Sequence, residues 1–141
     1  MNTTVRPRDI VLSMWRAFEA DHDLAVLDRY FAPGYQRFVG RSPAVDLKGW
    51  KATLQSLYTA FPDFHTAIDV VVAEGDWVTY RWTATARHLG DYLGVPSTGK
   101  FIEAVGISMI RFEDGRIREE RSSWNKVDVL HQLGVLPISP L

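Results

Sequence analysis

The chain has 141 residues, a formal net charge of −1 and no cysteine. This length predicts a single domain spanning residues 1–141 with a buried core, and the lack of cysteine excludes disulfides, thiolate chemistry and Cys-ligated zinc. Lys and Arg are scattered along the chain, which argues against binding to nucleic acid, because that function requires clustered positive charge.

No segment predicts export or membrane insertion. The N-terminus lacks the apolar core of a secretion signal, and no apolar run approaches the roughly 20 residues needed to cross a bilayer. We therefore expect a cytoplasmic protein that binds no membrane. Aromatic residues make up 12% of the chain, including five tryptophans. Either a well-packed core or a cavity for a flat apolar ligand would account for them.

The first half of the chain is predicted to be helical. Apolar residues recur there at helical spacing in three stretches. The helices are expected at residues 10–18, 24–31 and 47–61. Pro33 and Pro62 are expected to stop the second and the third helix, because proline cannot continue a helix.

The second half is predicted to form strands. Apolar and polar residues alternate there between turns that contain glycine, and a long loop with three glycines and a proline occupies residues 89–100. The strands are expected at residues 64–73, 77–88, 101–112 and 116–124, followed by a short helix at residues 126–133.

Helices followed by an antiparallel meander imply an α+β fold, in which the helices pack on one face of a curved sheet. A strongly curved sheet covered by helices leaves a hollow, and such hollows are usual places for small-molecule sites. The sequence therefore predicts a helix-covered, mostly antiparallel sheet around a hydrophobic cavity.

The common cofactor and metal motifs are missing from the sequence. It contains no Walker A motif, no GxGxxG, no HExxH and no GxSxG. The four histidines fall in separate predicted elements without the spacing of metal ligands. We therefore expect neither a metal ion nor an organic cofactor.

Polar side chains on the strand faces remain as candidates for chemistry. One face of the second predicted strand carries Arg81, and the other carries Trp82 and, at the strand end, His88. In the last strand Arg121 shares a face with Asn125, which stands just before the final helix. The two-residue period does not say which faces line the hollow, because a single bulge would exchange them.

Asn125 and His88 each have a structural and a functional interpretation. Asn is a preferred N-cap residue, and Asp128 stands three positions further on, where a capping-box acid belongs. A cap would stabilise the junction by about 1 kcal/mol without any ligand. A structural His88 would bond to a loop carbonyl, whereas a functional one would exchange a proton. The sequence leaves both alternatives open.

Four stretches together carry a family resemblance. They are RYFAPGY (residues 29–35), AFPDFH (60–65), GDWVTYRWTATARHLGDYLGVPSTGK (75–100) and RFEDGRIREERSSWNKVDVLHQLG (111–134). In this spacing and order they resemble the SnoaL-like polyketide cyclase family, within the NTF2-like fold. The resemblance extends from about Val11 to Gly134, and its most specific parts are the loop after His88 and the Gln132-Leu133-Gly134 ending.

The resemblance implies a cone-shaped barrel in which N-terminal helices and a curved sheet enclose a hydrophobic cavity. It also implies a homodimer without cofactor or metal. In the cyclases an aspartate at the end of the last strand acts as general acid/base in an aldol closure, and this position falls on Asn125. An amide cannot take up the proton. In addition, Arg121 stands where a tryptophan is common, and Phe38 where a polar residue is frequent.

Some proteins of this family are hydroxylases of anthracycline-type polyketides that need no flavin or metal and are aided by a separate reductase. The lost aspartate fits that subgroup. We therefore predict a cofactor-independent hydroxylase of an aromatic polyketide in antibiotic biosynthesis, with Asn125, His88 and Arg81 as catalytic residues. The predicted substrate-binding residues are Trp15, Tyr35, Phe38, Trp50, Phe61, Trp82, Arg121 and Trp124.

Two alternatives belong to other functional classes. The first is an aldol cyclase of the same family that uses a different base, such as His88. The second is a dimeric module that binds a small ligand and has no activity. Oxygen incorporation, ring closure and binding without turnover distinguish the three hypotheses.

Overall fold

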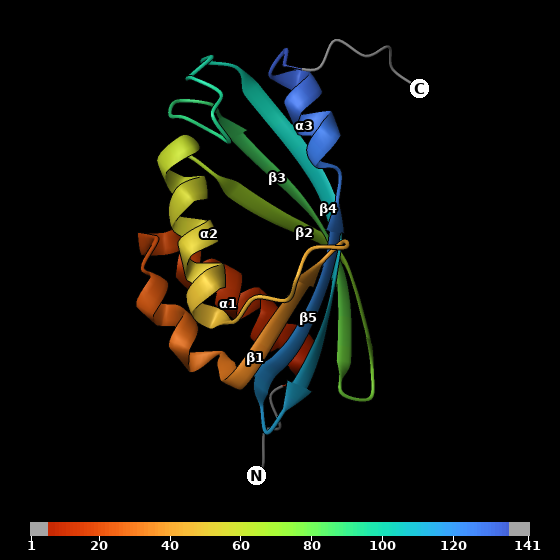
Figure 1. Ribbon diagram of the computed structural model, residues 1–141. Coiled ribbons are helices and arrows are strands. Elements are labelled where there is room, and N and C mark those ends of the chain that lie inside the picture. Colours follow the sequence, from red (N-terminus) through yellow and green to blue (C-terminus); the bar gives the residue numbers. More distant parts are fainter. Residues whose placement is uncertain (1–5, 136–141) are drawn as a thin grey trace.

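A computed structural model describes residues 6–135 of the chain. Two long helices, α1 (Pro7–Asp21) and α2 (Leu47–Ala60), lie on the concave side of a curved sheet, as Figure 1 shows. The short helix α3 (Lys126–Gln132) lies at one end of the sheet. The predicted α+β class, with helices packed on a curved and mostly antiparallel sheet, is confirmed.

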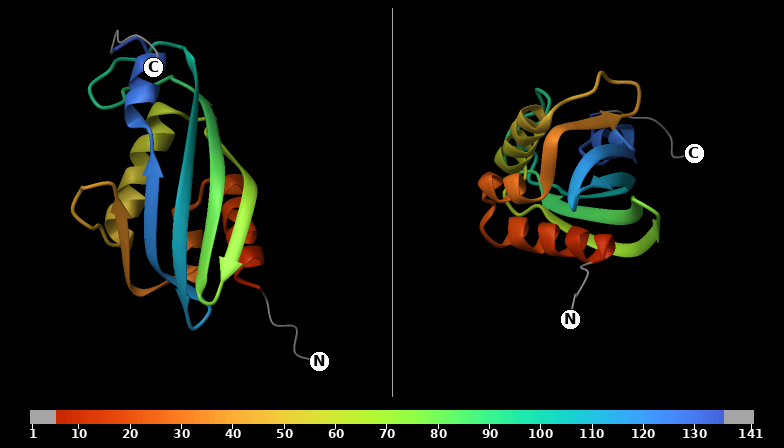
Figure 2. Two further views of the ribbon diagram at one scale, coloured as in Figure 1. Left: turned by 90° about the vertical axis from the view of Figure 1, so that its right-hand side faces the viewer. Right: turned by 90° about the horizontal axis from the view of Figure 1, so that it is seen from below.

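The sheet has five strands in the order β1-β5-β4-β3-β2. The pairs β2–β3, β3–β4 and β4–β5 are antiparallel, whereas β1 runs parallel to β5. The sheet is open, with β1 and β2 at its edges, and it curls around the helices (Figure 2). Its strands are β1 (Phe31–Val39), β2 (His65–Glu74), β3 (Trp77–Arg87), β4 (Phe101–Glu113) and β5 (Arg116–Trp124).

Strand β1 is absent from the sequence-based prediction, which placed a helix at residues 24–31 and a stop at Pro33. The structure has a 3-10 helix at Leu24–Arg29 and then the strand, with Pro33 inside it. An edge strand tolerates proline because its outer N–H groups need no partner. The register of β1 against β5 also shifts between Phe31 and Gln36, around a left-handed Gly34. Propensity and period alone do not reveal such an irregular edge strand.

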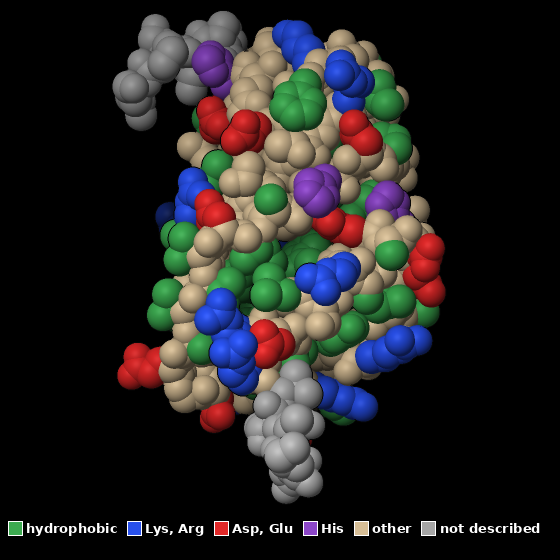
Figure 3. All heavy atoms as spheres, turned by 180° about the vertical axis from the view of Figure 1, so that it is seen from behind, with side chains coloured by type: hydrophobic (Ala, Val, Ile, Leu, Met, Phe, Trp, Pro, Cys, Tyr) green, Lys and Arg blue, Asp and Glu red, His purple; other side chains and the backbone are tan. Residues whose placement is uncertain are grey.

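The two faces of the sheet differ in burial. On β4 every second residue from Ile102 to Ile110 is buried against the helices, and the residues between them are exposed. Among the described residues no helix crosses the outer face, which Figure 2 shows uncovered. Figure 3 shows the molecule from behind, where hydrophobic side chains gather near the middle of this view and charged side chains surround them. The concave face of the sheet is therefore where the helices and the core lie.

Within residues 6–135, none of the helices is both long enough and apolar enough to cross a membrane.

The outer face generates a testable prediction about assembly. Its exposed apolar side chains include Val72, which is 60% exposed, and Ile107, which is 49% exposed. Apolar patches of this kind mark protein–protein contacts, so we expect a homodimer that buries this face. Ile107→Asp should give a monomer in light scattering, whereas Ala52→Glu on the exposed side of α2 should not. A wild-type monomer at micromolar concentration would contradict the prediction.

Candidate active site

A cavity of about 660 Å³ opens between α2, the concave face of the sheet, α3 and the loop at residues 89–100. This volume is in the range of sites for drug-sized ligands. Five of the predicted substrate-binding residues line it. They come from α1, from α2 and the position directly after it, from β3 and from β5: Trp15, Trp50, Phe61, Trp82 and Trp124.

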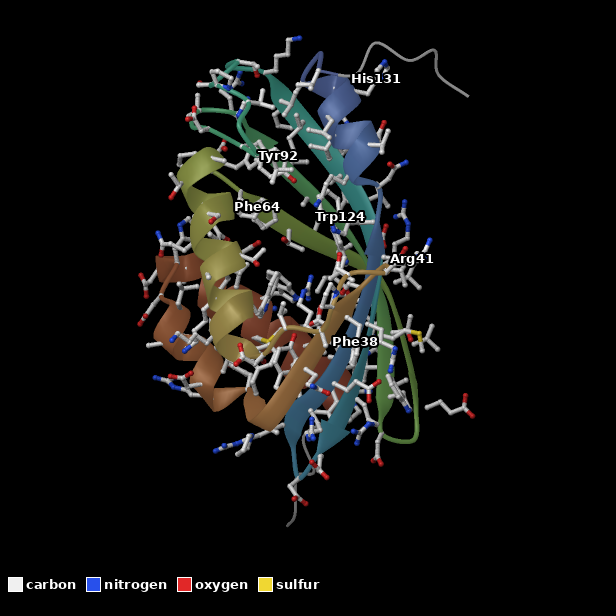
Figure 4. All side chains as sticks on the ribbon, in the orientation of Figure 1. Phe38, Arg41, Phe64, Tyr92, Trp124 and His131 are labelled. Atoms are coloured by element: carbon white, nitrogen blue, oxygen red, sulfur yellow. The ribbon has the colours of Figure 1, made fainter. Side chains whose placement is uncertain are left out.

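The outer part of the cavity is aromatic. Figure 4 shows Phe64, Tyr92 and Trp124 around the space between α2 and α3. Tyr92 comes from the loop at residues 89–100 and packs edge-on against Phe61, with ring centroids 5.2 Å apart. Stacked and edge-on aromatic side chains form flat, rigid walls, which suit a planar polycyclic ligand.

Gly106 on β4 sets the position of one of these walls. A Cβ atom at this residue would lie 2.2 Å from the Trp82 indole. The missing side chain therefore lets the indole lie directly on the β4 backbone. There its Nε1–H donates to Ser108 Oγ at 3.1 Å.

The inner end of the cavity contains an ion pair. Arg37 from β1 and Glu120 from β5 are only 8% and 5% exposed, they form a salt bridge, and both line the cavity. The Arg37 guanidinium lies over the Trp50 ring, 3.6 Å from its centroid. Burial alone would lower the pKa of Arg37, but the interactions with Glu120, Tyr35 and Tyr80 together outweigh burial and the pKa is raised. Arg37 is therefore a permanent buried cation.

Neutral donors complete the shell of Glu120. Tyr35 O–H donates to Oε1 at 2.6 Å, and Ser122 O–H donates to Oε2 at 3.0 Å. Ser122 Oγ lies 2.7 Å from Ser108 Oγ. Burial, followed by the charge of Glu120, raises the pKa of Tyr35 well above its ordinary value. Tyr35 therefore remains a protonated donor, and it supports the inner end of the cavity without lining it.

Three predicted site residues lie on the outer face of the sheet. Arg81 is exposed and pairs with Asp69. The guanidinium of Arg121 lies 4.3 Å from the centroid of the Phe38 ring. None of Arg81, Arg121 and Phe38 lines the cavity, so from these positions they do not contact a ligand bound there. The sequence left the strand faces open, and a register shift near the start of β5 places Glu120, Ser122 and Trp124 inward. The roles of Arg81, Arg121 and Phe38 stay predictions.

Asn125 is the N-cap of α3. Its Oδ1 accepts from the backbone N–H of Asp128 at 2.9 Å, as the capping interpretation predicts. Its side chain is exposed and is not part of the cavity lining, although its neighbours Trp124 and Lys126 are. The capping interpretation is therefore confirmed, and a catalytic role of Asn125 stays a prediction.

His88 is fully buried at the end of β3. Its Nδ1 lies 2.9 Å from Thr98 Oγ1 and accepts from the Thr98 N–H at 3.2 Å. Its ring lies 5.4 Å from that of Phe61, which lines the cavity while His88 does not. The structural interpretation predicted a bond to a loop carbonyl. The observed partner is instead a loop hydroxyl and its amide, which anchor the loop at residues 89–100.

Sequence reasoning missed the polar residues of the inner end. Arg37 lies in the strand that was not predicted. Glu120 and Ser122 alternate with Arg121 along β5 and lie on its buried face. The available signal was Glu120, a charged residue on the face of the strand that points to the core. Within the described part of the chain, no three His, Cys, Asp or Glu side chains lie close enough to hold a metal ion.

The Arg37–Glu120 pair leads to a prediction on stability. Arg37→Met leaves a buried carboxylate without its cation, which should cost about 3–5 kcal/mol of unfolding free energy. Arg81→Met removes an exposed pair on the neighbouring face and should cost no more than about 1 kcal/mol. Urea denaturation of both variants measures the difference. Equal losses would show that burial does not strengthen the inner pair.

The cap gives a second prediction. Asn125→Asp should unfold like the wild type, because Asp and Asn cap equally well, and Asn125→Ala should lose about 1 kcal/mol. Neither change should alter ligand affinity, since the side chain is outside the cavity lining. Denaturation together with titration of an aromatic ligand tests this. A fall in binding or turnover in Asn125→Asp at unchanged stability would restore Asn125 as a cavity residue.

Comparison with known proteins identifies the family. The model of the SnoaL-like polyketide cyclase family matches residues 9–133. Aklanonic acid methyl ester cyclase DnrD of Streptomyces peucetius is 35% identical over 60 residues, which are 43% of this chain and 41% of the cyclase. The match thus spans about two fifths of the curated relative.

Two solved structures are similar over almost the whole chain. AclR of Streptomyces galilaeus, provisionally named a hydroxylase, has a TM-score of 0.85 at 28% identity, covering 94% of this chain and 83% of AclR. IdmH of Streptomyces antibioticus, provisionally named a polyketide cyclase, has a TM-score of 0.81 at 31% identity, covering 93% of this chain and 100% of IdmH. Because the family model matches most of this chain, the chain belongs to the SnoaL-like polyketide cyclase family.

Proposed function

We propose that the protein is a cofactor-independent hydroxylase of an anthracycline-type polycyclic intermediate in antibiotic biosynthesis. The observation that carries the proposal is the composition of the cavity: tryptophan walls lead to a buried Arg37–Glu120 pair. At the position of the cyclase aspartate, Asn125 is occupied as a helix cap. The likeness to AclR supports the same assignment.

The chemistry requires an electron-rich ring system and dioxygen. A phenol or hydroquinone that has lost a proton can give one electron to O₂, and the resulting radical and superoxide combine to a peroxide anion at carbon. This anion takes back one proton and becomes a hydroperoxide. Two electrons from a separate reductase and two protons then convert the hydroperoxide to the alcohol and water. The net reaction is RH + O₂ + 2 e⁻ + 2 H⁺ → ROH + H₂O.

The residues of the cavity can assist this reaction in three ways. The tryptophan walls orient the flat ligand and exclude water. The remaining N–H groups of Arg37 can donate to the oxygen on which negative charge develops, and such preorganised donors are strongest in a water-excluded site. Trp50 stacks against the guanidinium, so the donors need not reorganise during the reaction.

Aldol cyclisation is the second candidate, because the curated relatives are named as aklanonic acid methyl ester cyclases. It needs a base for the carbon acid. His88 lies outside the cavity lining, which leaves Glu120 as the buried carboxylate nearest to a ligand. Binding without turnover is the third candidate.

Product analysis under ¹⁸O₂ tests the three candidates. A tricyclic or tetracyclic polyketide is incubated with the protein, with and without a reducing system. We expect one labelled oxygen in the product, because the inserted oxygen comes from O₂. Trp124→Ala should lower turnover, whereas Trp77→Ala should not, because Trp124 lines the cavity and Trp77 does not. A new ring without label would instead establish the cyclase, and tight binding without product would establish the binding module.

A further inference from the structure

We propose that Glu120 is the proton acceptor of the cavity, and that Ser108 and Ser122 relay to it the proton of a phenolic ligand. The inference rests on the proposed function for its ligand class, a polycyclic phenol. It assigns to the inner end of the cavity the deprotonation that the proposed chemistry requires.

The directions of the hydrogen bonds follow from the donors at the two ends. Trp82 Nε1–H can only donate, so Ser108 Oγ accepts from it at 3.1 Å. Ser122 donates to Glu120 Oε2 at 3.0 Å, so the 2.7 Å contact between the two hydroxyls must run from Ser108 to Ser122. The hydroxyl protons of Ser108 and Ser122 therefore both point along the hydrogen bonds that lead to Glu120.

A proton that enters at Ser108 can thus reach the carboxylate without rotation of any group. The ligand O–H gives its proton to Ser108 Oγ, Ser108 passes its own proton to Ser122, and Ser122 passes its proton to Oε2. The products are the ligand phenolate and a protonated Glu120. The direction of each hydrogen bond is then reversed, and Ser108 O–H donates to the phenolate oxygen.

The environment of Glu120 suits this transfer. One negative charge disappears from the carboxylate as another appears on the ligand, and Arg37 lies beside Glu120 in the cavity wall before and after. The net charge of the cavity is unchanged, and the phenolate replaces the carboxylate as the anion that balances the charge of Arg37. Tyr35 O–H still donates to Oε1, because burial keeps it protonated.

Of the two relay hydroxyls, Ser108 is the one that borders the cavity. Ser108 lines the cavity but is only 2% exposed, and Ser122, which does not line the cavity, is 5% exposed. A purely structural network would satisfy the buried charge equally well. The two interpretations differ in what happens to the proton when a phenol binds.

The test uses 2-hydroxyanthraquinone, a planar phenol whose absorption spectrum changes when its hydroxyl ionises. The wild-type protein binds the probe in a weakly buffered solution, below the pH at which the free probe ionises. If Glu120 accepts the proton, the ionised fraction of the bound probe should not depend on pH, because the transfer is internal. Binding should also release no proton to the solution, which a pH indicator measures.

Four variants separate the relay from simple stabilisation of the anion. Glu120→Gln should leave an ionised fraction that follows pH, with proton release. Ser122→Ala should lower the ratio of ionised to neutral bound probe about tenfold, the effect of one lost buried hydrogen bond. Ser123→Ala and Glu119→Gln, matched changes on the same strand outside the cavity lining, should behave as the wild type. If circular dichroism shows that Glu120→Gln is unfolded, the Ser122 and Ser123 pair decides.

The proposal is overturned if the wild-type-bound probe stays neutral, or if its ionisation follows pH and releases a proton. It is also overturned if Ser122→Ala equals Ser123→Ala. No oxygen is consumed in this assay, so its result is independent of the ¹⁸O₂ experiment. If the product of the ¹⁸O₂ experiment contains no label but the bound probe still transfers its proton internally, the hydroxylase proposal is refuted and Glu120 remains the proton acceptor.

Discussion

Arg37 and Glu120 are register partners on the parallel strands β1 and β5, and their opposite charges meet at the buried end of the cavity. A buried charge is costly unless it is paired and hydrogen-bonded. The pairing of the two charges therefore favours this register of edge strand β1 beside β5, although β1 contains a proline and a register shift. Trp50, Tyr35 and Ser122 are then arranged around the pair.

The position of this pair divides the interior in two. On one side lies the main core between α1, α2 and the sheet, where Glu120 borders a small void beside Phe31 and Leu54. On the other side lies the cavity, whose walls are tryptophans together with Phe61, Phe64 and Tyr92 near the loop at residues 89–100. An ionic boundary between a filled and an unfilled region gives a ligand one polar edge to recognise in an otherwise apolar space.

Asn125 serves the structure as the N-cap of α3. Its side chain is engaged with the N–H of Asp128, and the cavity lining near α3 is supplied instead by Trp124, Lys126 and Val129. A carboxylate at Asn125 would act from the α3 side of the cavity. Glu120 stands five residues earlier, on β5, and lies at the inner end of the cavity.

The sequence by itself determined the helices α1, α2 and α3, the meander from β2 to β5 and the cap at Asn125. These features depend on local spacing, turn residues and capping, which are legible within a few positions of the chain. It also indicated an aromatic cavity, and Trp15, Trp50 and Trp82 do line it.

The tertiary structure alone decided which polar groups meet in that cavity. Strand faces are read from a two-residue period, which one irregularity inverts, and the register shift near the start of β5 turned Arg121 outward and Glu120 inward. Arg37 reaches Glu120 across 83 positions of sequence only because β1 pairs with β5 in parallel. Such a pairing leaves no local pattern, because each strand carries only half of the ion pair.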